Sequence, residues 1–316
     1  MTRYIVHRMA AIALLTWGAV TLIFALLRLV PGDVVQILLG EGGMASPELV
    51  ASTRHSLGLD RPLLVQYGDW IAGLVHLNLG VSLATQRPIA TDIWNALPRT
   101  IELIAAALAF GVCVGIPAGL LGAVRRGWLR EAVVTSISLG GLAVPTFVSG
   151  TLMVLCFGLL LRWFPTAGYV SPAENFFVHL RYLVLPAVAL GLSVAAITAR
   201  YTHTAVLQVL GEDFVRTAYA KGLHSRGVMY HHVLKNALIP VITVLGVQGG
   251  YLLGGTIVVE YVFNWPGMSS LLIQGATRRD YPMVQGVVLV IAVLFLVLNL
   301  IVDLLNAYVD PRIRYS

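Results

Sequence analysis

Side chains that could carry out catalysis or bind a metal are few in this sequence, and they match no established motif. The chain has no Gly-x-x-x-x-Gly-Lys-Ser/Thr loop, no His-Glu-x-x-His, no Gly-x-Ser-x-Gly and no Cys-x-x-Cys. His231 and His232 are the only adjacent histidines, and neighbouring residues on a helix point about 100° apart, which is poor geometry for a shared metal. The sequence therefore predicts neither an enzyme nor a cofactor or metal site.

The composition instead predicts a membrane protein. Of the 316 residues, 58% are hydrophobic and 11% are charged, whereas soluble domains carry about 25% charged residues. A helix needs about 20 apolar residues to cross a bilayer. We therefore expect an all-α integral membrane protein, a single transmembrane domain over residues 1–316, with six spans at about 9–30, 99–124, 132–161, 181–200, 237–259 and 283–307. Pro145 lies inside the third span and predicts a kink there.

Few polar groups lie against the apolar runs. Arg28 is at the end of the first span and can reach the interface, whereas Asn299 and Asp303 are one turn apart near the end of the sixth. An acid inside a membrane suggests a functional site, but the depth of Asp303 favours a structural ion pair, with Arg8 or Arg200 as its expected partner. Cys113 and Cys156 are expected to be small packing residues.

The distribution of Lys and Arg predicts the orientation in the membrane. If both termini are cytoplasmic, the inner segments hold 12 Lys and Arg residues and the two short outer loops hold 4, which is the bias that the positive-inside rule requires. The net charge of +6 is thus explained by topology and does not indicate nucleic-acid binding. The outer loop 31–97 is too long to count, and its stretch Pro62–Val75 has helical apolar spacing, typical of a helix on the membrane surface or against the bundle.

The cytoplasmic loop 201–236 is longer than two helices need for a turn. Within it, Asp213–Gly222 is expected to form a short amphipathic helix, with an apolar stripe of Phe214, Ala218 and Leu223 and with acidic residues at its start. Gly222 is expected to end this helix, because glycine tolerates positive φ. From these residues alone, an ordinary surface helix is the favoured explanation of the pattern.

The fifth span and the outer segment after it predict a different kind of site. The span carries several glycines and Gln248, and the segment Phe263–Ala276 is apolar yet interrupted by Asn264, Pro266 and Gly267. Such a segment fits a gate over a cavity better than a surface facing lipid. Close helix packing remains the alternative. The candidate pore and gate residues are Gln248, Tyr251, Phe263, Trp265, Pro266, Ser269 and Ile273.

Motifs along nearly the whole chain resemble the permeases of ABC importers of the dipeptide, oligopeptide and nickel branch. Arg216–Leu223, followed by Asn236–Pro240, is similar to the "EAA" loop of that family, although Arg216 stands where the wider superfamily has Glu. The other matching stretches are Leu29–Asp33, Leu57–Pro62 with Gln66-Tyr67, Gly254–Glu260, Phe263–Met268, Asp280–Pro282, Asn299–Leu305 and Asp310–Tyr315. His76–Gly80 departs from the family pattern, because it lacks the usual acid. The outer loop and the terminus resemble the first of two permease subunits.

The resemblance implies a type I ABC importer permease in the inner membrane, which forms the pore of a larger complex. Its partners would be a second homologous permease, two ABC ATPase subunits that carry out all hydrolysis, and an extracytoplasmic substrate-binding protein. The short helix would then transmit motion from the ATPase. The implied coupling residues are Asp213, Phe214, Arg216, Thr217, Ala218, Tyr219, Ala220, Lys221 and Gly222. The cargo stays open among dipeptides, oligopeptides, nickel chelates, glutathione, haem and oligosaccharides.

Two other classes of protein are less well supported. A secondary, ion-coupled transporter needs ionisable groups at mid-membrane in paired, broken helices, and the sequence offers only Arg28 and Asp303 near span ends. An intramembrane hydrolase needs a nucleophile or metal motif within a span, and no such motif is present. A pore served by a separate binding protein is expected to lack a deep charged site.

Overall fold

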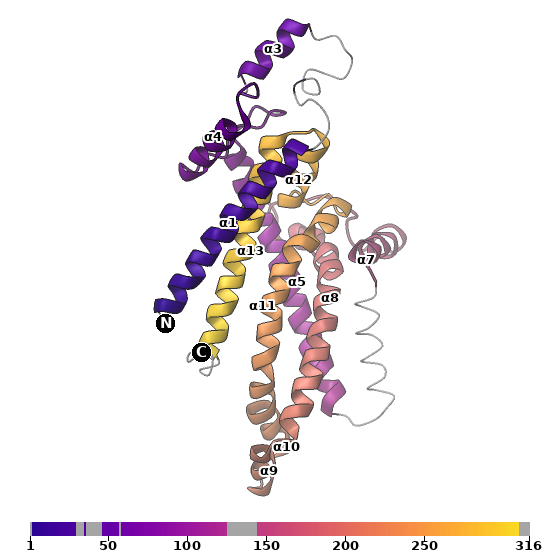
Figure 1. The fold of residues 1–316 in the computed structure, drawn as a ribbon. Coiled ribbons are helices and arrows are strands. Elements are labelled where there is room, and N and C mark those ends of the chain that lie inside the picture. The colour runs from indigo at the N-terminus through magenta and orange to yellow at the C-terminus, as the bar shows by residue number, and fades with distance from the viewer. Residues whose placement is uncertain (1, 30–34, 36–45, 57, 125–143, 310–316) are drawn as a thin grey trace. The chain divides into compact units, whose positions relative to one another are not determined.

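The computed structural model describes residues 2–29, 35, 46–56, 58–124 and 144–309, and side chains within these ranges apart from 2–8, 56 and 303–309. The described residues form helices and no strand, apart from one isolated β-bridge between Val81 and Pro88 (Figure 1). The contacts divide the chain into two compact units, Met1–Arg99 with Gly267–Leu296 and Thr100–Pro266 with Val297–Ser316. The expectation of one domain is untested and remains a prediction.

Five described helices are long and apolar enough to span a membrane: Met9–Leu29, Ile89–Val124, Phe176–Leu210, Ser225–Val262 and Tyr281–Val302. They include or overlap the expected spans one, two, four, five and six. Much of the expected third span, residues 132–143, lies outside the described residues. Its described part consists of α7 (Thr146–Met153) and the π-helix η1 (Val154–Leu160). The third span, the total of six spans and the cytoplasmic termini therefore remain predictions.

Pro145 was expected to bend a continuous helix, but it stands at a helix start instead. It is the N-cap of α7, which begins at the next residue. A proline disfavours helical geometry in the residue before it and has no N–H to donate, so it starts a helix more readily than it bends one. The helix of the expected fourth span, α8 (Phe176–Leu210), starts before residue 181, where the span was expected to begin. Its N-cap is Asn175, whose side chain accepts a hydrogen bond from the Val178 N–H at 3.1 Å.

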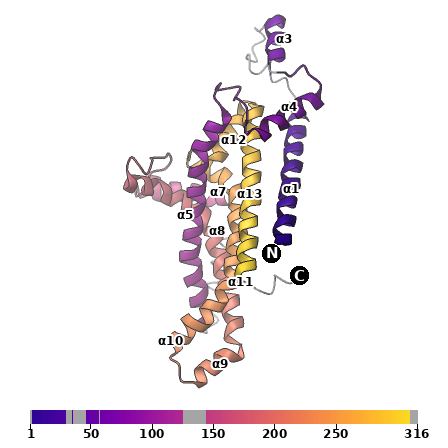
Figure 2. The ribbon, with the colours of Figure 1, turned by 90° about the vertical axis from the view of Figure 1, so that its left-hand side faces the viewer.

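The second unit contains α8, α11 (Lys235–Val262) and most of α5 (Ile89–Val124), which run side by side in both views (Figures 1 and 2). Gly111, Gly115 and Gly119 recur every four residues along α5 and face α8. A Cβ atom at Gly115 would lie 2.7 Å from the Ala195 carbonyl oxygen, and one at Gly119 would lie 2.4 Å from that of Ala199. Only glycine allows the two backbones to approach this closely.

The first unit is built around an apolar cluster and one buried carboxylate. The cluster joins the start of α5 to α12 (Met268–Thr277) and α13 (Tyr281–Val309) through Ile89, Ile93, Ala96, Met268, Met283 and Val287. Asp280, 2% exposed, accepts hydrogen bonds from Ser82 Oγ at 2.5 Å and from the Met283 N–H at 3.2 Å. Asp280 thus caps α13 and fastens the loop at Ser82 to it.

The outer loop carries α3 (Pro47–Ser56) and α4 (Leu63–Val75), and α4 packs on α1 (Thr2–Leu29) (Figure 2). The Trp70 ring stacks on Phe24 with centroids 5.9 Å apart, and the hydroxyls of Tyr67 and Thr21 lie 2.7 Å apart. The structure therefore places α4 against α1, while its position relative to the membrane surface remains a prediction.

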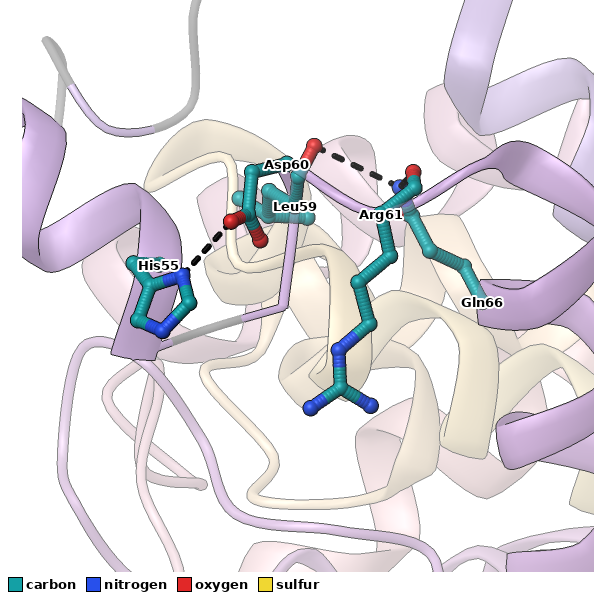
Figure 3. Close-up of polar contacts among 5 residues, drawn as sticks. All are labelled: His55, Leu59, Asp60, Arg61 and Gln66. Carbon is teal, nitrogen blue, oxygen red and sulfur yellow. Dashed lines mark hydrogen bonds and ion pairs between the residues drawn. The ribbon is translucent and has the colours of Figure 1, made fainter.

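The turn before α4 lies in the stretch Leu57–Pro62 with Gln66-Tyr67, and hydrogen bonds of this stretch hold it. Gln66 Nε2 donates to the Arg61 carbonyl oxygen at 2.8 Å, while His55 Nδ1 lies 2.6 Å from Asp60 Oδ2 (Figure 3). The hydrogen bond from His55 lowers the pKa of the Asp60 carboxyl below its ordinary value. Because a lowered carboxyl pKa favours the folded state above the ordinary pKa, the stabilisation from the ionised Asp60 is present above that pKa and is lost as the pH falls through the lowered pKa.

Candidate functional site: the α9 helix and the α11 segment

The expected amphipathic helix is present as α9 (Asp213–Ala220). Asp213 lies in its first turn, where a negative charge is favourable to the helix dipole. The ion pair between Arg216 and Asp213 is 3.5 Å long and exposed on both sides, so it contributes little to stability. Figure 1 shows α9 together with α10 (Ser225–Gly227) at one end of α8 and α11.

Gly222 ends the helix in the way its residue type predicts. Its φ is +78°, and its N–H donates to the Tyr219 carbonyl oxygen at 2.9 Å, while the Leu223 N–H donates to that of Ala218 at 3.3 Å. This pair of bonds is a Schellman motif, in which a left-handed glycine satisfies the last carbonyls of a helix. A Cβ atom at Gly222 would meet no atom of this chain within 4 Å. Glycine is therefore required by the positive φ of the backbone and not by a lack of space for a side chain within this chain.

The two faces of α9 differ from the expected stripe. Val215 and Ala218 are 1% and 6% exposed, whereas Phe214 and Leu223 are 44% and 46% exposed. The spacing of Val215 and Ala218 places them on the same side of the helix. They pack in a cluster with Ala123, Ala205, Val206, Val228, Val233 and Ala237. Phe214 is therefore available for a partner, and Val215, which the expected stripe omitted, anchors the helix.

The anchor includes a π-helix, η2 (Val228–Leu234), which leads into α11. Val228 and Val233 are five residues apart and both are 0% exposed. A π-helix bonds residue i to i+5, so these two valines share one face, which packs in the cluster that holds α9. His231 and His232 lie in the same turn, and among the described residues no group of three possible metal ligands occurs.

The outward face of α9 presents most of the predicted coupling residues to solvent. Tyr219 is 43% exposed, and the remaining predicted coupling residues, Arg216, Thr217, Ala220 and Lys221, are exposed beside it. Apart from the Arg216–Asp213 pair, these side chains offer aromatic, hydroxyl and cationic groups to solvent. This surface belongs to a helix that is anchored on its other side by Val215 and Ala218 and capped by Gly222. Such a surface is suited to docking another protein.

The candidate pore and gate residues differ in their exposure. On α11, Tyr251 is 69% exposed and Gln248 is partly buried. Phe263 and Trp265 are 2% and 0% exposed. Pro266 and Ile273 are partly buried, and Ser269 is fully buried.

Phe263 and Trp265 are held by contacts within the second unit. The Gly168 N–H donates to the Phe263 carbonyl oxygen at 2.8 Å, and the Tyr169 ring lies edge-on to Trp265 with centroids 4.8 Å apart. These two aromatic residues are therefore packed in this state, and the gate remains a prediction.

Ionisable groups that the sequence reading missed lie buried in the helices of the second unit. Glu260 is 0% exposed, and Thr100 Oγ1 donates to its Oε1 at 2.7 Å. His179 is 1% exposed; its Nε2 lies 2.8 Å from Glu102 Oε1 and its Nδ1 lies 2.7 Å from the Val170 carbonyl oxygen. An acid or histidine next to a long apolar run was the available signal.

Asn299 lies in α13 and is partly buried. The side chain of Asp303 is outside the described part of the chain, as is that of Arg8. The expected ion pair of Asp303 therefore remains a prediction.

Comparisons of the sequence with families and with curated proteins agree over nearly the whole chain. The family model "Binding-protein-dependent transport system inner membrane component" matches residues 115–315, and the model of its N-terminal part matches residues 1–104. The chain is 39% identical to the di/tripeptide transport system permease protein DppB of Pseudomonas aeruginosa and 37% to the dipeptide permease DppB of Escherichia coli K12. It is 36% identical to the glutathione transport system permease protein GsiC of the same strain. Each alignment covers 100% of both chains.

Solved structures show the same fold at low sequence identity. A chain of the inward-facing MetNI methionine ABC transporter matches with a TM-score of 0.58 and 16% identity, over 69% of this chain and 96% of that one. A chain of an amino acid ABC transporter with histidines matches with a TM-score of 0.54 and 16% identity, over 69% of this chain and 94% of that one. The family models and the full-length relatives favour the importer over the ion-coupled transporter.

Proposed function

We propose that this chain forms half of the pore of an ATP-driven importer of peptide-like solutes. The premise is that the chain belongs to the family of binding-protein-dependent transport system inner membrane components and is a multi-pass inner membrane protein. The family implies partner ATPases and a binding protein. The finer composition, with a second homologous permease, two ATPase subunits and one extracytoplasmic binding protein, is part of the proposal. The observation that carries the cargo class is the full-length likeness to relatives named for di/tripeptide, dipeptide and glutathione transport.

In the proposed mechanism α9 is the contact with the ATPase and faces the cytoplasm. Its inner face is fixed by Val215 and Ala218, and its outer face presents Phe214 and Tyr219. When ATP closes the ATPase dimer, a rigidly anchored helix transmits the displacement to α8 and α11, whose residues share its cluster. Transmission requires that the ATPase contact the two states of the permease differently. In this proposal the partner ATPase hydrolyses ATP, and the helices of this chain move to open and close the path of the cargo.

The proposed path follows the exposed side of α11 at Gln248 and Tyr251. Tyr251 is a large side chain that is 69% exposed on a helix with few charges, which suits an unspecific pathway. Specificity would then lie in the binding protein. Gly249 and Gly250 are buried, which is also compatible with the alternative interpretation of helix packing.

Uptake into proteoliposomes that contain the whole importer tests the proposed function. We expect radiolabelled alanyl-alanine to accumulate only when ATP and the binding protein are present, and we expect no accumulation when the ATPase subunits are left out. Dissipating ion gradients with ionophores should leave the initial uptake rate unchanged. Uptake that persists without ATP and stops with ionophores would establish the ion-coupled transporter instead.

A further inference from the structure

A cavity of about 460 Å³ with a mixed polar and apolar lining lies within the first unit. Its wall is formed by the end of α1, by α4, by the loop 78–86 and by the start of α13, and its polar lining includes Arg28, Asp69, Tyr281 and Gln285. This volume falls in the range of about 300–1,000 Å³ that small-molecule sites occupy. None of the candidate pore and gate residues lines it.

Two buried donors at this cavity lack a hydrogen-bond partner. Tyr281 and Gln285 are 8% and 7% exposed, and within the described part of the chain neither the Tyr281 hydroxyl nor Gln285 Nε2 has a hydrogen-bond partner. Both residues come from the start of α13 and are one turn apart. Buried polar groups are normally satisfied, and an unmatched one is costly. A ligand group that accepts a hydrogen bond from either donor would remove the cost for that donor.

Arg28 adds a fixed positive charge to the same wall. Its Nη2 donates to Gln66 Oε1 at 2.5 Å, and its guanidinium carbon lies 4.7 Å from the centre of the Phe24 ring. Gln66 is itself fastened to the Arg61 carbonyl oxygen (Figure 3). A guanidinium has five N–H donors, so this contact leaves others for an anion. Arginine held in place in this way is a preferred receptor for carboxylates.

We propose that this cavity binds the carboxylate of a small cargo molecule through Arg28, the Tyr281 hydroxyl and the Gln285 amide. The cargo class rests on the proposed function above. Asp69, which is paired with Arg61 at 3.1 Å, provides an acceptor at the same cavity for the ammonium group of a zwitterion, and Trp70 provides an apolar surface. The ligand class is therefore a small peptide or amino acid derivative with a free carboxylate. Such a site contrasts with the expectation that an importer pore lacks a charged site.

Binding to the whole permease–ATPase complex in nanodiscs, without the binding protein, tests the proposal. The probes are alanyl-alanine and its C-terminal amide, titrated by saturation-transfer NMR. Hydrogen bonds to charged groups contribute about 1.5–3 kcal/mol, so Tyr281→Phe and Gln285→Met should each weaken alanyl-alanine binding about tenfold or more. Both replacements keep the size of the side chain. The amide should bind the unmodified complex about tenfold more weakly than the acid.

Matched replacements at exposed positions outside the cavity lining, Tyr261→Phe and Gln208→Met, should leave binding unchanged. Absence of binding to the unmodified complex overturns the proposal, as does equal affinity in all variants. It is also overturned if the cavity variants weaken association with the binding protein but leave alanyl-alanine binding intact, since the cavity would then receive an acidic side chain of that protein. Size-exclusion profiles identify a variant that fails to assemble, in which case Arg28→Lys replaces it.

ATP-driven uptake by the same complex separates the two proposals. If ATP-driven uptake occurs but alanyl-alanine does not bind in the cavity, only the proposed cavity site is refuted. If ATP-driven uptake is absent, the proposed function is refuted.

Discussion

Replacing Gly222 with valine should abolish ATP-driven uptake while the protein still inserts into the membrane. Gly222 has a φ of +78°, and a β-branched residue in this region of backbone space costs roughly 1–3 kcal/mol. The strain falls on the Schellman motif that ends α9, so the helix loses its fixed geometry at the surface proposed to contact the ATPase. Uptake and ATPase activity of the reconstituted importer are the measurements. Hydrolysis should continue without transport.

Gly222→Asn is the informative companion, because asparagine tolerates the left-handed region and its Cβ would meet no atom of this chain within 4 Å. If valine and asparagine both stop uptake, the space beside Gly222 is filled by the ATPase. If only valine stops it, the cap geometry is what coupling needs. Normal uptake with both variants contradicts the role of α9.

Gly119→Ala should destabilise the permease strongly, although it adds one methyl group. The new Cβ would lie 2.4 Å from the Ala199 carbonyl oxygen and 2.7 Å from Thr202 Cβ, closer than atoms can pack. Because one obstacle is backbone, α5 and α8 must separate, and overpacking of this kind costs about 1–3 kcal/mol or more. We expect a lower Tm and less assembled complex.

Gly18→Ala in α1 is the matched control for this prediction. A Cβ there meets no atom within 4 Å, and alanine in a helix is favoured over glycine by roughly 0.5–1 kcal/mol. This variant should be as stable as the unmodified protein or more so. Equal melting temperatures for the two variants would contradict the close approach of α5 and α8.

The hydropathy of the chain predicted five spans that the structure describes, because length and apolarity are properties of each segment alone. The cap at Gly222 was predictable for the same reason, since positive φ is a local demand on residue type. Helix ends were less predictable. The start of α8 depends on the Asn175 cap, and α7 begins after Pro145 instead of bending at it.

Features that depend on pairing between distant segments were not predictable from the sequence. The periodicity of α9 did not distinguish Phe214 from Val215 as the buried residue, because the choice depends on where α8 and η2 lie. The pairs Thr100–Glu260 and Glu102–His179 join residues 160 and 77 positions apart. The glycine repeat in α5 is visible in the sequence, but its partner surface on α8 is not.

Cross-linking from α9 to the ATPase tests the central claim most directly. The native cysteines Cys113 and Cys156 are exposed and are first replaced with alanine. A cysteine at Thr217, on the exposed face of α9, is then treated with a short bifunctional maleimide in the assembled importer. A cysteine at the exposed Gln274 of α12 is the control. We predict a covalent product between the permease and the ATPase subunit from Thr217→Cys and none from Gln274→Cys. Failure of Thr217→Cys to cross-link, in both the nucleotide-free and the ATP-trapped complex, would contradict the assignment of α9 as the ATPase contact.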